Sequence, residues 1–271
     1  KLGADVEVVE YMDHILPGMD REISDSFHKI LKRQGMKFNL SSKVSGVKNQ
    51  GKNALIQFEK DGSNHNLTAD VVLVCVGRKA NTEGLKLENA NIEKDERNRV
   101  KIDKHFQTNV QNIYAIGDVV AGPMLAHKAE EEGIAVAEII SGKFGHVNYN
   151  VIPNVVYTHP EIASVGKTEE ELKKDSIEYK AGKFPFMANS KAKVNDEAEG
   201  FVKILADKTT DKILGVHIVG PDAGNLIAEL ALAMEFGASS EDIARTCHAH
   251  PTLTEAVKEA ALAVDKRPIH M

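Results

Sequence analysis

A histidine and a glutamate near the C-terminus have the types and spacing of an acid–base pair. His250 directly precedes Pro251, and Glu255 follows in the first turn of a helix expected over 252–264. A carboxylate beside an imidazole fixes its tautomer and stabilises the imidazolium, so His250 could act as a general base. Thr252 and Glu255 also fit an S/T-x-x-E capping box, in which the glutamate serves only the helix end. Spacing alone leaves both interpretations open.

A second segment, Gly117 to Ala129, combines an acid with a helix start. A strand predicted over 112–118 places Asp118 at its C-terminal tip, and a Gly- and Pro-containing loop leads into a helix predicted over 125–140. The first amides of that helix can face partial negative charge, such as a carbonyl oxygen of a flavin ring. Asp118 could accept a hydrogen bond from a polyol chain. The alternative is an ordinary loop before a helix, with an incidental acid.

The first strand signal also ends in an acid. Val6 to Val9 is a short β-branched run, and Glu10 follows it. A carboxylate at the end of a parallel strand can accept both ribose hydroxyls of an adenosine, as in dinucleotide-binding folds. The glycine fingerprint that should lie about 20 residues upstream is not in this chain. A solvated glutamate at a strand end is the competing interpretation.

The two cysteines and the second His-Pro pair indicate no further chemistry. Cys75 and Cys247 lie far apart without a CxxC motif, which favours a reducing compartment over a disulfide framework and predicts no metal site. Cys75 lies in the apolar run 71–77 and is expected to be inert core. Residues 157–161, which contain the second His-Pro pair, are expected to form a turn. His127 by itself is expected to be a first-turn helix residue.

The surrounding elements predict parallel α/β structure first and antiparallel α+β structure later. A strand over 6–9, a helix over 20–34 with Gly35 after it, and a strand over 36–40 suit a parallel crossover. Two antiparallel strands and a central strand are then expected over 44–48, 54–59 and 71–77. Beyond Gly142 the patterns predict strands over 155–157, 178–186, 201–206 and 213–219, and helices over 224–236, 241–247 and 252–264.

Length and composition bound the class of protein. The chain has 271 residues, of which 42% are hydrophobic and 27% charged, values typical of globular proteins. With 34 Lys and Arg against 40 Asp and Glu, the net charge is −6, which argues against nucleic acid and anionic membrane as partners. No apolar run reaches the roughly 20 residues of a membrane-spanning helix.

Four motifs together resemble the dihydrolipoyl dehydrogenase branch of the pyridine nucleotide-disulfide oxidoreductase family. They are Ile113–Val120, Gly122–Glu130, Gly182–Phe186 and His248–Leu253. Glutathione and mercuric reductases share the architecture but are less similar at the second and fourth motifs. The resemblance implies α/β and α+β structure in three parts: the C-terminal part of a Rossmann-like NAD domain (1–78), a central FAD-contacting domain (79–145) and an α+β dimerisation, or interface, domain (146–271).

The same resemblance implies the site residues and the reaction. NAD would be lined by Glu10, Val44 and Gly77, and FAD would be held by Asp118, Met124, Leu125, Ala126 and His127. His250, oriented by Glu255, would be the acid–base acting on the partner subunit's redox centre, so a homodimer is implied. The reaction would be oxidation of dihydrolipoamide with reduction of NAD⁺, and the partner the lipoyl domain of 2-oxo acid dehydrogenase complexes. The location would be bacterial cytoplasm or mitochondrial matrix.

The chain departs from the family pattern in what it lacks. The N-terminal FAD domain, the glycine fingerprints and the closely spaced redox cysteines are not in this sequence. We therefore expect a C-terminal fragment that is inactive alone. Two alternatives stay open: a non-enzymatic dimerisation module, and a fragment of a related disulfide reductase.

Overall fold

The computed structural model describes residues 2–271 and divides them into two compact units. One unit, here unit 1, contains the chain up to Val72 and again from Asn150 onward, and the other, unit 2, is Leu73–Tyr149. No helix within the described residues is long and apolar enough to cross a membrane.

Unit 1 is built on a five-stranded antiparallel sheet with the strand order β6-β7-β10-β9-β8. The strands are β6 (Asn154–Val156), β7 (Glu161–Gly166), β8 (Tyr179–Pro185), β9 (Phe201–Asp207) and β10 (Ile213–Gly220). The two neighbours β9 and β10 are almost entirely buried. Both faces of the sheet are therefore covered.

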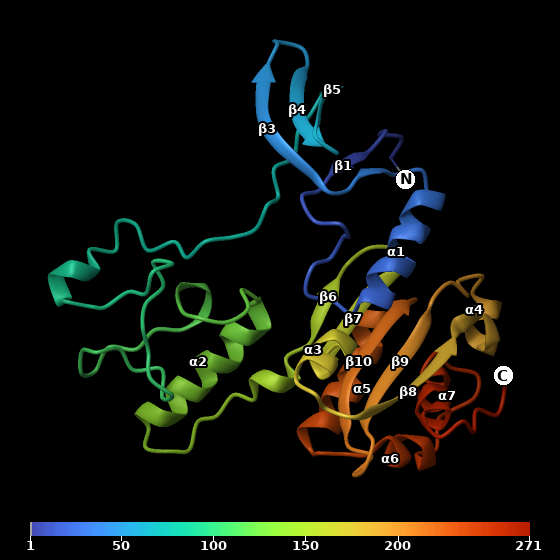
Figure 1. Ribbon diagram of the computed structural model, residues 1–271. Coiled ribbons are helices and arrows are strands. Elements are labelled where there is room, and N and C mark those ends of the chain that lie inside the picture. Colours follow the sequence, from blue (N-terminus) through green and yellow to red (C-terminus); the bar gives the residue numbers. More distant parts are fainter. Residues whose placement is uncertain (1) are drawn as a thin grey trace. The chain divides into compact units, whose positions relative to one another are not determined.

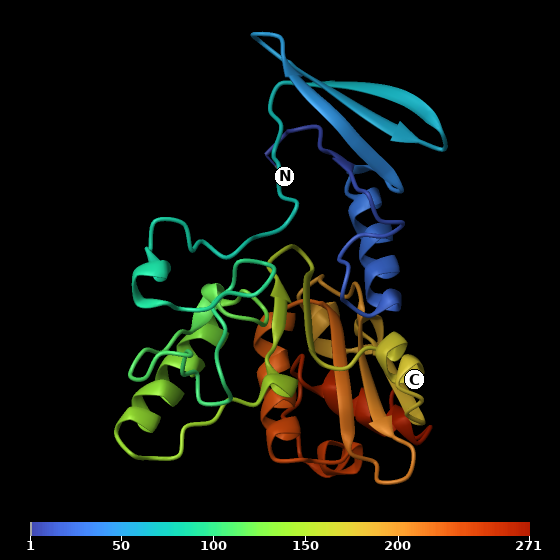
Figure 2. The same cartoon turned by 60° about the vertical axis from the view of Figure 1, so that its left-hand side comes forward.

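Different helices cover the two faces of this sheet (Figures 1 and 2). Val216 and Ile218 point into an apolar core shared with α5 (Ala223–Glu235) and α7 (Glu255–Val264). Val219, which points to the opposite face of the same strand, packs in a second cluster with residues of α1 (Arg21–Arg33). The remaining helices of unit 1 are short: α3 (Glu169–Lys174), α4 (Ser190–Val194) and α6 (Ser240–Arg245).

Helix α1 (Arg21–Arg33) connects two parallel strands, as predicted. Strand β1 (Glu7–Val9) pairs in parallel with β2 (Lys37–Asn39). The Asp20 carboxylate caps the helix by accepting the Glu22 N–H at 3.1 Å, and Gly35 after the helix has φ +97°. A separate three-stranded antiparallel sheet follows, made of β3 (Ser42–Asn49), β4 (Ala54–Lys60) and β5 (Ser63–Ala69).

Unit 2 contains little regular structure. Its long element is α2 (Ala126–Ile140), and short 3-10 turns lie at Leu87–Ala90 and Gly117–Val119. Among its described residues the only β pairings are two isolated bridges, Lys94 with Val100 and Gln107 with Tyr114. A further 3-10 turn, Tyr149–Val151, begins at its last residue.

The predicted fold class is confirmed, as are the predicted helices and most of the strands. The predicted central strand 71–77 is wrong: these residues form no strand, and their side chains are largely exposed, Val76 at 93%. An extended apolar segment is buried only where strands on both sides pair with it, and no described strand pairs with this one. Cys75 is consequently exposed, and its assignment to the core is wrong.

The strand predicted over 112–118 is also wrong. Only Tyr114 makes a β bridge, and the segment ends in the 3-10 turn at Gly117. Gly117 has φ +72°, which ends any extended conformation. The turn expected over 157–161 lies between β6 and β7, but Glu161 already begins β7, which the sequence did not predict. Strand β5 and helices α3 and α4 were likewise not predicted.

Candidate functional site

His250 and Glu255 meet at the start of α7. The His250 Nδ1 atom lies 2.8 Å from Glu255 Oε1, and the Thr252 N–H donates to Glu255 Oε2 at 2.8 Å. The Thr252 hydroxyl donates to the Ala249 carbonyl, so only the glutamate half of the predicted capping box forms. The two interpretations that spacing left open are therefore both met by one carboxylate, which holds the imidazole with one oxygen and the backbone with the other.

This contact defines the ring atom available for proton transfer. Because the Glu255 carboxylate accepts at Nδ1, the neutral imidazole carries its hydrogen there and has its basic lone pair on Nε2. Burial disfavours ionisation of Glu255, but the Thr252 N–H and His250 outweigh it and hold the pKa of the carboxyl below its ordinary value. The His250 side chain is 66% exposed, so Nε2 is accessible.

A second histidine–glutamate pair lies beside the first. Glu259, one turn along α7, is buried, and its Oε1 lies 2.7 Å from His270 Nδ1. A hollow of only about 20 Å³ separates the two pairs, lined by Phe184, Ala188, Asn189, Ser190, His250, Glu255, Glu259 and His270. It holds at most a water, so a substrate would approach His250 from its exposed side. Glu259 and His270 are 11 positions apart, and their contact was not predicted from the sequence.

In unit 2, buried polar groups fix the turn that carries Asp118. The Gly117 N–H donates to Glu132 Oε2 at 2.7 Å, and Lys128 Nζ donates to the Gly117 carbonyl at 2.9 Å. Lys128 and Glu132 pair at 3.0 Å with both side chains fully buried, and the Tyr149 hydroxyl donates to Glu132 Oε1 at 2.6 Å. Sequence reasoning missed this network, although Lys128 and Glu132 have the i,i+4 spacing of a helix ion pair.

The loop between this turn and α2 fits a flavin in two respects. Asp118 is exposed, and Leu125, the residue before α2, provides no side-chain cap at the positive end of the helix dipole. His127 is the second residue of α2, as predicted. The predicted flavin residues Asp118 and 124–127 thus lie in one short stretch of chain, which runs from the 3-10 turn to the first residues of α2. Their role stays a prediction.

The predicted NAD residues lie in different units. Glu10 follows β1 and accepts the Met12 N–H at 2.8 Å, and Val44 on β3 is 45% exposed. Both belong to unit 1, whereas Gly77 is an exposed residue of unit 2. Unit 1 therefore brings together two of the three, and the NAD site stays a prediction.

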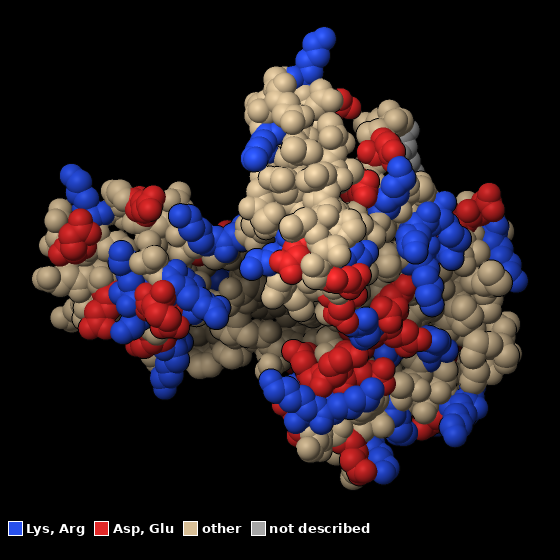
Figure 3. Space-filling model, turned by 45° about the horizontal axis from the view of Figure 1, so that its top comes forward, with Lys and Arg blue, Asp and Glu red and all other residues tan. Residues whose placement is uncertain are grey.

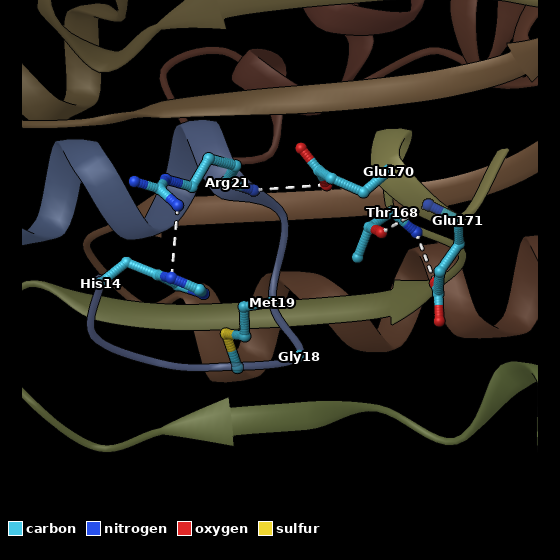
Figure 4. A pocket seen from close by; sticks show the side chains of 7 residues that line it. All are labelled: His14, Gly18, Met19, Arg21, Thr168, Glu170 and Glu171. Carbon is cyan, nitrogen blue, oxygen red and sulfur yellow. Dashed lines mark hydrogen bonds between the residues drawn. The ribbon is translucent and has the colours of Figure 1, made fainter. Parts of the chain in front are cut away.

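A larger hollow was not predicted from the sequence. It measures about 320 Å³ (Figure 4) and is lined by His14, Gly18, Met19, Arg21, Thr168, Glu170 and Glu171. Its polar groups are engaged with one another: Arg21 Nη1 lies 3.2 Å from His14 Nδ1, and Glu171 accepts the Thr168 N–H at 2.9 Å. The lining carries no arrangement that indicates a reaction.

Three carboxylates near this hollow surround a lysine. Those of Asp20, Glu22 and Glu169 offer oxygens within 4.8 Å of one another. Lys203 Nζ lies 2.9 Å from Asp20 Oδ1 and 2.7 Å from Glu169 Oε2, so the ammonium supplies the positive charge that the cluster needs. Figure 3 shows that acidic and basic side chains also lie next to one another on the surface that it draws. The cluster is an ion-pair network that joins α1 to β9 and α3.

Comparisons with known proteins identify the family of the chain. The "Pyridine nucleotide-disulphide oxidoreductase" family model matches residues 1–133, and the model of that family's dimerisation domain matches 152–261. Dihydrolipoyl dehydrogenase 2, mitochondrial, of Arabidopsis thaliana is 57% identical over 100% of this chain and 54% of its own length. Dihydrolipoyl dehydrogenase, mitochondrial, of Bos taurus is 55% identical over 97% of this chain and 52% of its own.

Solved structures show the same fold. LpdA from Mycobacterium tuberculosis superimposes with a TM-score of 0.87 at 28% identity, covering 96% of this chain and 56% of that one. The chain spans about half the length of the curated relatives that it matches. The two family models together span most of its residues, in the order that the motifs predicted. The chain belongs to the pyridine nucleotide-disulfide oxidoreductase family.

Proposed function

We propose that the protein to which this chain belongs is a dihydrolipoyl dehydrogenase, with His250 as its acid–base and Glu255 as the group that orients it. The observation that carries the proposal is the 2.8 Å contact between His250 Nδ1 and Glu255 Oε1, which leaves an accessible Nε2. Relatives with that name, 55–57% identical to this chain, support the same reaction.

The chain's own residues would handle the proton. His250 Nε2 takes the proton of one thiol of dihydrolipoamide, and Glu255 stabilises the imidazolium that forms. The thiolate then attacks an enzyme disulfide, whose bond breaks as a mixed disulfide with the substrate forms and one enzyme sulfur leaves as a thiolate. The second substrate thiol passes its proton to that thiolate and displaces the other enzyme sulfur, which closes lipoamide and leaves the enzyme's sulfurs reduced. Neither Cys75 nor Cys247 is expected to supply that disulfide, since they are not closely spaced. FAD, when bound, would carry the electron pair from the thiols to NAD⁺.

The cofactor assignments follow from the loops described above. Asp118 and residues 124–127 would hold FAD, because an exposed carboxylate lies shortly before a helix start whose positive dipole end has no side-chain cap. Glu10, Val44 and Gly77 would line NAD. In domain terms, 1–78 would be part of the NAD domain, 79–145 the central domain and 146–271 the interface domain.

The partners follow from the dimerisation domain. We expect a homodimer through residues 146–271, with His250 serving the partner subunit's redox centre, and lipoyl domains of 2-oxo acid dehydrogenase complexes as the protein substrates. The mitochondrial names of the relatives favour the matrix as the location. Sedimentation tests the first point, since a full-length protein that stays monomeric at micromolar concentration contradicts it.

The reaction is tested with His250→Gln in the full-length protein. We expect kcat for dihydrolipoamide oxidation to fall about 10²–10⁴-fold, the range for loss of a general base. Electron transfer from NADH to ferricyanide needs no thiol deprotonation and should be retained. His159→Gln is the matched control, because His159 also precedes a proline and is 55% exposed. Equal oxidation rates for parent and His250→Gln would refute the assignment.

A further inference from the structure

The segment that carries His250 contains a second histidine with the opposite environment. The His248 side chain is 4% exposed, whereas that of His250 is 66% exposed. The sequence motif contains both residues, but the reaction described above uses only the outer one. The proposed reaction therefore does not explain why the buried residue His248 is a histidine.

Both ring nitrogens of His248 face oxygen acceptors. Nδ1 lies 3.0 Å from the Thr246 carbonyl oxygen, and Nε2 lies 2.9 Å from Glu229 Oε1. A carbonyl oxygen and an ionised carboxylate only accept hydrogen bonds, and a neutral imidazole has a single N–H to donate. Only the doubly protonated ring donates to both. The geometry therefore favours an imidazolium paired with the Glu229 carboxylate.

The charges around the ring act in opposite directions. The hydrogen bond from His248 to Glu229 raises the pKa of the histidine above its ordinary value, although partial burial opposes the charge. Lys258 on α7 lowers it, and its Nζ donates to the same Thr246 carbonyl at 2.7 Å. Glu229, on α5, is thus the group that keeps the ring charged.

His248 lies in the segment that connects α6 to α7, and its ion pair joins this segment to α5. Helix α6 ends at Arg245 and α7 begins at Glu255, and the residues between them form no helix or strand. Glu255 orients the His250 ring, but it does not hold the chain that precedes the ring. His248 connects that chain to α5, whose residues are packed in the main core.

We propose that His248 is a positioning residue for His250, held as an imidazolium that fastens residues 246–250 to Glu229 of α5. The inference deepens the proposed function and rests on the role given there to His250. It assigns His248 no contact with substrate. Its effect is on the geometry in which Nε2 of His250 meets a thiol, to which proton transfer is sensitive.

The protonation state is tested without any reaction. In this chain with ¹⁵N-labelled histidines, NMR at pH 7 should show both ring nitrogens of His248 protonated. Glu229→Gln should move the pKa of His248 down, and Lys258→Met should move it up. A His248 ring that is neutral at pH 7 overturns the proposal, as does a pKa that ignores Glu229.

The positioning role is tested by kinetics on the full-length protein. His248→Gln and Glu229→Gln should each lower kcat for dihydrolipoamide oxidation about tenfold, with KM nearly unchanged, since misplacing a base slows the chemical step. The double variant should be no slower than either single one, because both changes break the same pair.

Multiplying losses in the double variant, or a change confined to KM, would overturn the role. Glu241→Gln at the start of α6 is the control for a lost carboxylate, since Glu241 pairs with Arg245 and Arg267 and not with a histidine of the motif. If His250→Gln leaves oxidation intact, the proposed function fails. The NMR result then still decides the state of His248 separately.

Discussion

The two candidate sites are held in place by different kinds of interaction. The start of α7, with Glu255, stands on the apolar core of unit 1, where Val257 and Ala260 are fully buried. The turn of Asp118 in unit 2 depends on Lys128 and Glu132, a buried ion pair in contact with the Gly117 backbone. A site on an apolar core shares its support among many contacts, whereas a site on a polar network depends on each member.

The composition of the two interiors explains the difference. The buried apolar residues of unit 2 are few and scattered along the chain: Ala80, Val100, Phe106, Val120 and Ala135. They leave the backbone of the Gly117 turn to be satisfied by side chains, and buried N–H and C=O groups need partners. The charged pair provides those partners. Hydrogen bonds and an ion pair therefore hold the Gly117 turn of unit 2, whereas apolar packing holds the start of α7 in unit 1.

The largest effect is expected from Glu132→Gln in unit 2. The change leaves the Lys128 ammonium buried without its carboxylate, a loss that costs about 3–5 kcal/mol of unfolding free energy. Urea denaturation and limited proteolysis within residues 73–149 measure it. Glu130→Gln is the matched control, because Glu130 is an exposed residue of the same helix. Similar midpoints for the two variants would show that the buried pair does not support unit 2.

In unit 1, a comparable loss of unfolding free energy requires removal of most of a buried apolar side chain. Leu230 on α5 is fully buried, and Leu230→Ala should cost about 2–5 kcal/mol because a cavity remains. Leu232→Ala on the same helix is the control, since Leu232 is 61% exposed and should change stability by less than about 0.5 kcal/mol. The comparison fails if Leu230→Ala is as mild as its control, since the core would then not carry unit 1.

Local patterns in the sequence predicted the elements that are self-contained. Helix α1 was predicted from the spacing of Ile23, Phe27 and Ile30, and all three are buried. The hairpin of β9 and β10 and the helix pair α5 and α7 were predicted in the same way. In each case the burying partner lies in the same unit, so the periodicity of the sequence and the packing agree.

Sequence patterns gave wrong predictions where the burial of a segment depends on neighbouring strands that lie outside that segment. Residues 71–77 are as apolar as β10, yet only β10 has hydrogen-bonded neighbours on both sides. At the candidate site the contact of His250 with Glu255, five positions apart, was one of the two interpretations that spacing left open. His248, in the segment between α6 and α7, and Glu229 on α5 are 19 positions apart, and no local rule predicts such a contact.

The smallest expected effect concerns that contact and depends on pH. A histidine whose pKa is higher folded than unfolded stabilises the fold fully below its unfolded pKa of about 6.5, and this stabilisation is lost as pH rises through the folded pKa. Glu229→Gln should therefore lower the unfolding free energy by about 1 kcal/mol near pH 6 and by progressively less toward pH 9, since the pair is partly exposed.

Denaturation at a series of pH values measures this dependence. Glu241→Gln provides the contrast, because its arginine partners stay charged throughout this range and its effect should be flat. If the loss of unfolding free energy caused by Glu229→Gln does not change with pH, His248 is neutral in the folded chain. Lys258 of α7 would then still bind the Thr246 carbonyl, but no ion pair would join the segment before His250 to α5.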